Sequence, residues 1–120
     1  MNSEDTTPAA PAIDVAALLD RCQNNAQLAG RLAARFICEA PAQIAALHDA
    51  LHSENAVEFA RLLHKLRGSL GIFGATVAHD AAAVLEGRAG SRSLTGCEPM
   101  LVDLASEVQR ACGELAELGR

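Results

Sequence analysis

Large apolar residues recur every three to four positions along much of this chain, which is the spacing that places them on one face of an α-helix. In residues 59–73 that face carries Phe59, Leu62, Leu66, Leu70 and Phe73. The same spacing continues in residues 28–51 and 101–118. Because an apolar helix face must pack against another element to leave water, the pattern favours a helical bundle.

The composition agrees with an all-α fold. Alanine and leucine, both strong helix formers, make up about a third of the 120 residues, and the chain has no Trp, no Tyr and three Phe. A chain of this length is expected to form one domain, and one so poor in aromatic residues is not expected to form a sandwich or a barrel. We predict a disordered lead-in over residues 1–11 and, over residues 12–120, an antiparallel four-helix bundle with a short extra N-terminal helix.

Polar residues and proline indicate where the helices begin and end. Asp14 is expected to cap the short first helix, and Asn24 or Asn25 to begin a longer second one. Pro41 is expected to kink or split the second helix, because its ring removes a backbone hydrogen bond and clashes with the preceding turn. The next helix is expected to start at Asn55, whose capping-box partner is Glu58. The remaining elements are a left-handed cap at Gly74, a helix over 76–86, a loop over 87–96 and a last helix that begins near Pro99.

The helical wheel of residues 59–73 puts His64 on the face opposite the leucines, so its imidazole is expected to point at water. Its neighbours on that face, within about 60°, are Ala60, Arg61, Arg67, Gly68 and Gly71. Each interior helical glycine costs about 0.5–1 kcal/mol relative to alanine. Two such glycines beside one histidine favour a site that a partner protein approaches closely. Tight packing between helices at Gly68, Gly71 and Gly74 is the alternative reading.

The segment around His64 resembles the signature of the histidine-containing phosphotransfer (HPt) domain, H-x-[LIV]-K-G-[SA]-x-x-x-x-G-A. The matching residues are His64, Leu66, Gly68, Ser69, Gly74 and Ala75, and Arg67 stands where the family usually has lysine. Residues 36–51 resemble the family's F-x-x-x-x-P-x-x-[LI]-x-x-L-x-x-A-L helix, and residues 84–86 resemble the end of its helix after the histidine. The resemblance covers about residues 13–118.

The resemblance implies a role for each residue around the histidine. His64 would be the phosphoacceptor, and Arg67 would neutralise the phosphoryl oxygens. Glu86 stands about where the family has a polar orienting residue, often glutamine. Its carboxylate would accept a hydrogen bond from Nδ1 and leave Nε2 to attack, although it also reads as an exposed glutamate that closes a helix. The partner would contact Ala60, Arg61, Lys65, Gly68 and Gly71.

The implied function is that of a phosphocarrier in a two-component phosphorelay. His64 would accept a phosphoryl group from the aspartyl phosphate of a receiver domain and pass it to another receiver aspartate. The expected partners are response-regulator receiver domains and a sensor or hybrid histidine kinase. The chain has no nucleotide-binding motif, so we expect no independent enzyme activity and no cofactor, with Mg²⁺ only on the receiver domain. The alternatives are a degenerate HPt-like adaptor that carries no phosphate, and a histidine-dependent enzyme or metal-binding bundle.

Charge and hydropathy argue against other classes of protein. The net charge of −5 disfavours a nucleic-acid binder, which would show a basic stripe. No apolar run approaches the roughly 20 residues of a membrane span, and residues 1–11 lack the pattern of a secretory signal. We therefore expect a cytoplasmic protein. We also expect a monomer, because the bundle should bury its leucine stripes within one chain. The start of the chain favours a free-standing protein over the excised end of a hybrid kinase.

The remaining histidines and the cysteines are expected to have no chemical role. His48 and His52 lie four residues apart, a spacing that can chelate Zn²⁺ or Ni²⁺ on a helix. No third ligand is evident from the sequence, so we expect a solvated face and no metal site. His79 and Asp80 are expected to be structural or solvent-facing. The four cysteines are expected to be buried or half-buried thiols in a reducing compartment: Cys22, Cys38, Cys97 and Cys112.

Overall fold

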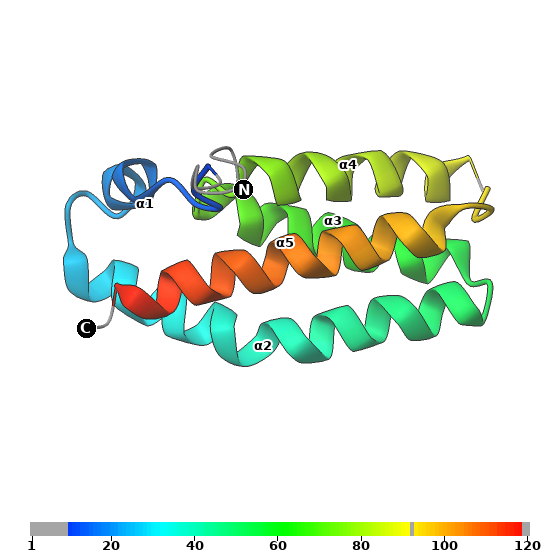
Figure 1. Ribbon diagram of the computed structural model, residues 1–120, viewed down its shortest axis with the longest axis horizontal. Helices are drawn as coiled ribbons and strands as arrows, with labels where there is room; N and C mark the ends of the chain where they lie inside the picture. Colours follow the sequence, from blue (N-terminus) through cyan, green and yellow to red (C-terminus); the bar gives the residue numbers. More distant parts are fainter. Residues whose placement is uncertain (1–9, 92, 119–120) are drawn as a thin grey trace, which may run out of the picture.

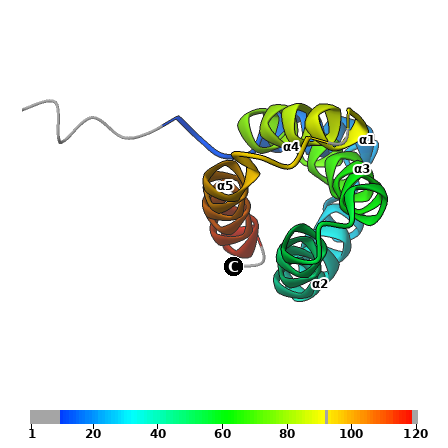
Figure 2. The same cartoon turned by 90° about the vertical axis from the view of Figure 1, so that its right-hand side faces the viewer.

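The computed structural model describes residues 10–91 and 93–118, and over that part of the chain every regular element is a helix. The elements are α1 (Val15–Arg21), α2 (Ala26–His52), α3 (Ala56–Ile72), α4 (Thr76–Gly90) and α5 (Cys97–Glu117). The four long helices form an antiparallel bundle, and α1 lies at the end where α2 begins (Figure 1). Seen along the bundle, they follow one another in the order α2, α3, α4, α5 around the core (Figure 2). The predicted fold class is therefore confirmed.

The core is built from the predicted apolar stripes. Each of the four long helices packs against its two neighbours, and α3 and α4 share the most extensive interface. Leu62 lies half-buried at the edge of the core, whereas Leu63, which the wheel did not place there, is fully buried. The largest fully buried side chains are Phe59, Leu18, Leu47, Leu63, Leu66, Leu70, Leu85, Leu101, Leu104 and Leu115. The core therefore faces away from the His64 side of α3.

Three helices begin with a side-chain cap at the predicted residue. Asp14, Asn25 and Asn55 each accept a hydrogen bond from the backbone N–H three residues later. Such a cap satisfies a donor that the first helical turn leaves free, and its loss typically costs about 1 kcal/mol. The predicted capping box is only half formed, because the Glu58 carboxylate accepts hydrogen bonds from Arg61 instead of reaching back to Asn55.

At Pro41 the structure excludes one of the two expected outcomes, and one predicted helix boundary is wrong. Helix α2 continues through Pro41 rather than splitting there, and buried side chains before and after the proline, Ala40 and Leu47, hold both halves on the core. Helix α4 runs past Glu86 to Gly90, so the first four residues of the predicted loop are helical. Burial of Ala89 extends the apolar face of α4 by one turn. The hydroxyl of Ser91 then donates to the Arg88 carbonyl over 3.0 Å at the end of the helix.

The turn between α3 and α4 requires glycine. Gly74 has a φ of +65°, the left-handed conformation that was predicted for it. A Cβ atom at this position would lie 2.6 Å from the Cβ of Asp14. The Asp14 N–H in turn donates to the Phe73 carbonyl over 3.0 Å. The turn is thus packed directly against the residue that begins α1.

The N-terminal segment is held on α5. The N–H groups of Ala12 and Ile13 donate to the Glu114 carboxylate over 2.8–3.1 Å, and both residues are buried. Residues 1–9 of the predicted lead-in lie outside the described part of the chain. Within that part, none of the helices is long and apolar enough to cross a membrane.

The cysteines follow the prediction with one exception. All four are free thiols, of which Cys22 and Cys97 are buried and Cys112 is half-buried. Partial burial raises the pKa of the Cys112 thiol. Cys38 is exposed, so the prediction for it was wrong. It lies two residues from both Phe36 and Ala40, which are buried, and a position offset by about 200° on the helix faces solvent.

Candidate functional site

The candidate site centres on His64, in the middle of α3. Its side chain is 69% exposed, while Leu63 and Leu66 on either side of it are buried. The apolar stripe of α3 fixes the rotation of the helix and so turns the imidazole toward solvent. An accessible neutral imidazole has one ring nitrogen with a free lone pair, which is what a nucleophile needs.

The Nδ1 atom of His64 is bonded across the interface between α3 and α4. It lies 3.0 Å from Oε2 of Glu86. A carboxylate only accepts hydrogen bonds, so Nδ1 carries the hydrogen in this pair, and Nε2 then has the lone pair. The hydrogen-bonding contacts that His64 forms with described side chains both involve Nδ1, and none involves Nε2. The arrangement therefore orients the ring and presents one defined nitrogen to solvent.

Arg67 completes a three-residue cluster one turn along α3. Its Nε lies 3.4 Å from Oε1 of Glu86, and its Nη2 lies 3.3 Å from Nδ1 of His64. Because Nδ1 donates to Glu86, the guanidinium cannot also donate to it, and Arg67 acts here mainly through its ion pair with the carboxylate. The Oε1 atom of Glu86 is buried and forms no hydrogen bond with any described residue. The Arg67–Glu86 contact was not predicted from the sequence.

The glycines of α3 are not needed for packing within the molecule. A Cβ atom at Gly68 would meet nothing within 4 Å, and one at Gly71 would meet only the His79 ring at 3.8 Å, an ordinary contact. The alternative reading, in which the glycines allow helices to pack closely, therefore does not apply to Gly68 or Gly71; only at Gly74, in the turn after α3, would a Cβ collide with a neighbour, Asp14. Several other helical glycines are equally open, among them Gly113, so it is the position beside His64 that distinguishes Gly68.

The other predicted partner-binding residues also flank His64. Lys65 is exposed, and Ala60 is half-buried against the core. Arg61 is engaged with Glu58 through hydrogen bonds of 2.6 and 2.8 Å. This bonding raises the pKa of the Arg61 guanidinium and lowers that of the Glu58 carboxyl. Much of the Arg61 charge is therefore offset within α3. Lys65, which also lies beside His64, forms no ion pair with any of the described residues.

A family model with the description "Hpt domain" matches residues 31–117, which include the whole of this cluster. The chain belongs to the Hpt domain family. It is accordingly a histidine phosphocarrier of phosphorelay signalling. The comparison with curated proteins found no match.

Two solved Hpt structures share this fold. Histidine-containing phosphotransfer protein B from Pseudomonas aeruginosa superposes with a TM-score of 0.83 at 18% identity, over 91% of this chain and 95% of the other. The HPT domain of an Hpt sensor hybrid histidine kinase from Shewanella superposes with a TM-score of 0.78 at 15% identity, over 88% of this chain and 92% of the other. At these identities the likeness concerns the fold.

Proposed function

We propose that His64 is the phosphoacceptor of this Hpt domain and that its Nε2 atom carries the phosphoryl group. The observation that supports this is the asymmetry of the ring: Nδ1 is held 3.0 Å from Glu86, while the side chain is 69% exposed. The Nε2 lone pair attacks the phosphorus of a receiver's aspartyl phosphate in line, and the bond from phosphorus to the carboxylate oxygen breaks as that carboxylate leaves.

The phosphorylated ring explains why a carboxylate sits at Nδ1. With phosphorus on Nε2 and hydrogen on Nδ1, the imidazole ring is cationic, and Glu86 lies next to that charge. Arg67 is one turn away and is paired with Glu86 on the Nδ1 side of the ring; on phosphorylation its guanidinium would turn toward the phosphoryl oxygens and neutralise them. The reverse step returns the phosphoryl group to an aspartate of another receiver. Positioning and charge are thus the contributions of this chain, and the Mg²⁺ would be bound by the receiver.

The proposed partners are receiver domains of response regulators and a sensor or hybrid histidine kinase. The open positions at Gly68 and Gly71 would allow the receiver's active-site loop to approach His64. We propose that the chain acts as a monomer, without nucleotide chemistry of its own. A cytoplasmic location belongs to the same proposal, since it would keep the four free thiols reduced.

The direct test is transfer from a phosphorylated receiver domain. The wild-type chain should take up label that is labile to acid and stable to base. His64→Gln should take up none while staying folded, with an unfolding free energy within about 0.5 kcal/mol of wild type, because the side chain is exposed. His79→Gln is the matched control and should be labelled normally. Receiver binding without any uptake of label by the wild type would instead support the adaptor function.

A further inference from the structure

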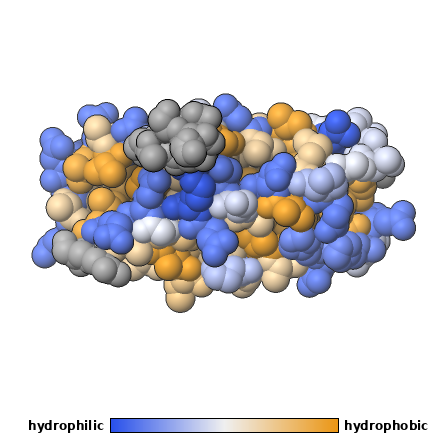
Figure 3. Space-filling model, viewed as in Figure 1, coloured by the Kyte–Doolittle hydropathy of each residue, from blue (hydrophilic) through white to orange (hydrophobic). Residues whose placement is uncertain are grey.

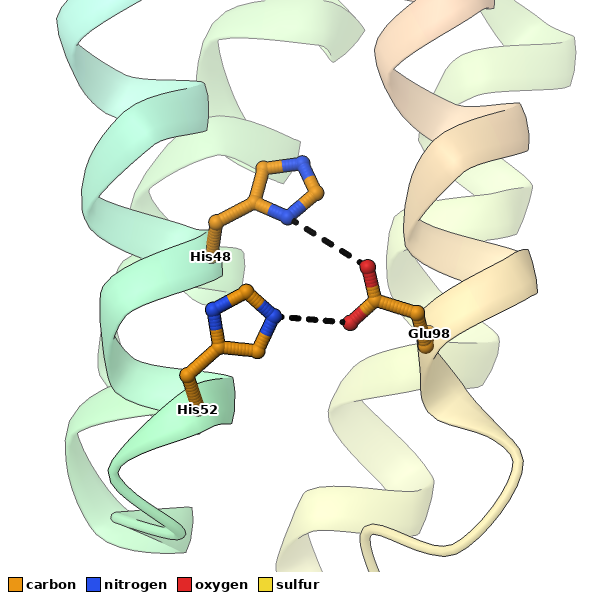
Figure 4. Close-up of side chains that lie close together, drawn as sticks. All are labelled: His48, His52 and Glu98. Carbon is orange, nitrogen blue, oxygen red and sulfur yellow. Dashed lines mark hydrogen bonds and ion pairs between the residues drawn. The ribbon is translucent and has the colours of Figure 1, made fainter.

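A second cluster of ligating side chains lies between the end of α2 and the start of α5. His48 and His52 are one helical turn apart, and both rings point toward the carboxylate of Glu98 (Figure 4). His52 Nε2 lies 3.1 Å from Oε1 of Glu98, and His48 Nδ1 lies 3.8 Å from Oε2. The three ligand atoms all lie within 4.8 Å of one another. Glu98 thus offers the third ligating group that was not evident from the sequence.

These distances suit a tetrahedral metal ion. Bonds of about 2.0–2.2 Å to nitrogen and oxygen place the ligand atoms of a tetrahedral Zn²⁺ about 3.3–3.6 Å apart. The two histidine–glutamate distances, 3.1 and 3.8 Å, lie close to that range but end on different carboxylate oxygens, so the side chains must turn to bring both imidazoles to one ion. The side chains of His48, His52 and Glu98 are 30%, 64% and 51% exposed, so small rotations can close the site and an ion can enter directly from solvent.

The two helix ends at the cluster carry opposite partial charges: the last turn of α2, which ends at His52, is partly negative, and the first turn of α5, which carries Glu98, is partly positive. The carboxylate of Glu98 is therefore the charge that attracts a cation. Two neutral imidazoles and one carboxylate form a ligand set that suits Zn²⁺ and its neighbours in the first transition row rather than Mg²⁺ or Ca²⁺.

The other histidine–carboxylate pairs of the described chain lack these features. The His64–Glu86 pair has the Arg67 guanidinium 3.4 Å from its carboxylate, and that positive charge opposes a metal ion. The His79–Asp80 pair joins neighbouring residues of one helix. Among the described residues, it does not belong to a group of three side chains that could hold a metal ion. The cluster at the α2–α5 contact is therefore distinct in chemistry as well as in place.

We propose that His48, His52 and Glu98 bind one Zn²⁺ or a similar divalent transition-metal ion, with water in the fourth position. The ion links the C-terminal end of α2 to the N-terminal end of α5, two helices that also pack against each other. It is a structural link between helices and takes no part in the chemistry at His64, which lies between α3 and α4.

The experiment is a titration of the full chain with ZnCl₂, followed by calorimetry and by thermal unfolding. The wild type should bind one Zn²⁺ per chain, and free Zn²⁺ at 100 times the dissociation constant should raise the thermal midpoint by about 10 °C. His48→Gln, His52→Gln and Glu98→Gln should each weaken binding by at least about tenfold, since loss of even an outer-shell partner has an effect of that size. All three side chains are exposed or half-exposed, and circular dichroism verifies that the variants are folded.

Two matched controls separate this site from other zinc ligands. His79→Gln removes a histidine of a different carboxylate pair, and Cys38→Ser removes the exposed thiol; both should leave the affinity and the thermal shift unchanged. The proposal is overturned if the wild type binds no Zn²⁺. It is equally overturned if the three ligand variants bind as the wild type does, or if either control loses binding to the same extent as they do.

Discussion

The two ring nitrogens of His64 have different surroundings, and we propose that this difference determines which of them reacts. Nδ1 is 3.0 Å from a carboxylate oxygen whose side chain is 24% exposed, and the rest of the ring faces solvent. A hydrogen bond to a charged group of this kind contributes about 1.5–3 kcal/mol when it is shielded from water. In the proposed mechanism the bond both selects the tautomer and favours the cationic ring that would carry the phosphoryl group.

Glu86→Ala should slow transfer to His64 about tenfold, equivalent to about 1.4 kcal/mol, because the ring loses its orienting acceptor. Glu86→Gln should recover most of the rate, since the amide oxygen can still accept from Nδ1. Single-turnover transfer from a phosphorylated receiver measures both. An unchanged rate in Glu86→Ala would show that Glu86 does not orient the ring.

Gly68→Gln should leave the fold intact, because the new side chain meets nothing within 4 Å of its Cβ and glutamine is the better helix former by up to about 1 kcal/mol. Transfer should nevertheless be blocked, because the side chain occupies the approach to His64. Gly113→Gln, an equally open position on α5, is the control for a general effect of the substitution. Full transfer by folded Gly68→Gln would contradict the docking role of this glycine.

At the level of the helices, local sequence signals explain the starts better than the ends. Asp14, Asn25 and Asn55 cap the helices that were predicted to begin there, because a cap depends on residues three positions apart. The end of α4 depends instead on burial of Ala89, a tertiary contact, and was predicted too early. Helix α2 likewise continues through Pro41 because side chains on both sides of the proline, Ala40 and Leu47, are buried in the core. Helical periodicity predicted which face His64 occupies, but it could not give the register of α3 against α4.

Gly74→Ala should destabilise the chain by at least about 1–2 kcal/mol, because its φ of +65° is unfavourable for a residue with a Cβ. The new methyl group would also lie 2.6 Å from the Cβ of Asp14, so α1 must shift. Gly71→Ala is the matched control: it is helical, has ordinary space and should be neutral or stabilising by about 0.5–1 kcal/mol. Equal thermal midpoints for the two variants would contradict this account of the turn.

The whole bundle brings together residues that are distant in the sequence. His64 and Glu86 meet across α3 and α4, and His52 and Glu98, 46 residues apart, meet across α2 and α5. The family resemblance identified the first pair, since it places a polar residue near Glu86. No comparable pattern existed for the second, so Glu98 could not be recognised as a neighbour of the two histidines before the helices were packed.

The molecule should be a monomer in solution. Its leucine stripes are buried within one chain, and hydrophobic and hydrophilic residues are interspersed over the face shown in Figure 3. The large apolar side chains that are exposed in the described residues include Val57, Val77 and Val102, which belong to three different helices. A stable dimer typically buries about 1,200–2,000 Å². Sedimentation at micromolar concentration should show one species with the mass of one chain, and a stable dimer would contradict this prediction.

The central claim, that Nε2 of His64 carries the phosphoryl group, is tested most directly by locating the phosphate on the ring. The full chain is labelled with ¹⁵N at histidine, phosphorylated by a phosphorylated receiver and studied by NMR at alkaline pH, where phosphohistidine is stable. We predict that only the His64 ring changes and that phosphorus is bonded to Nε2. Phosphate on His48, His52 or His79, or on Nδ1 of His64, would contradict the account.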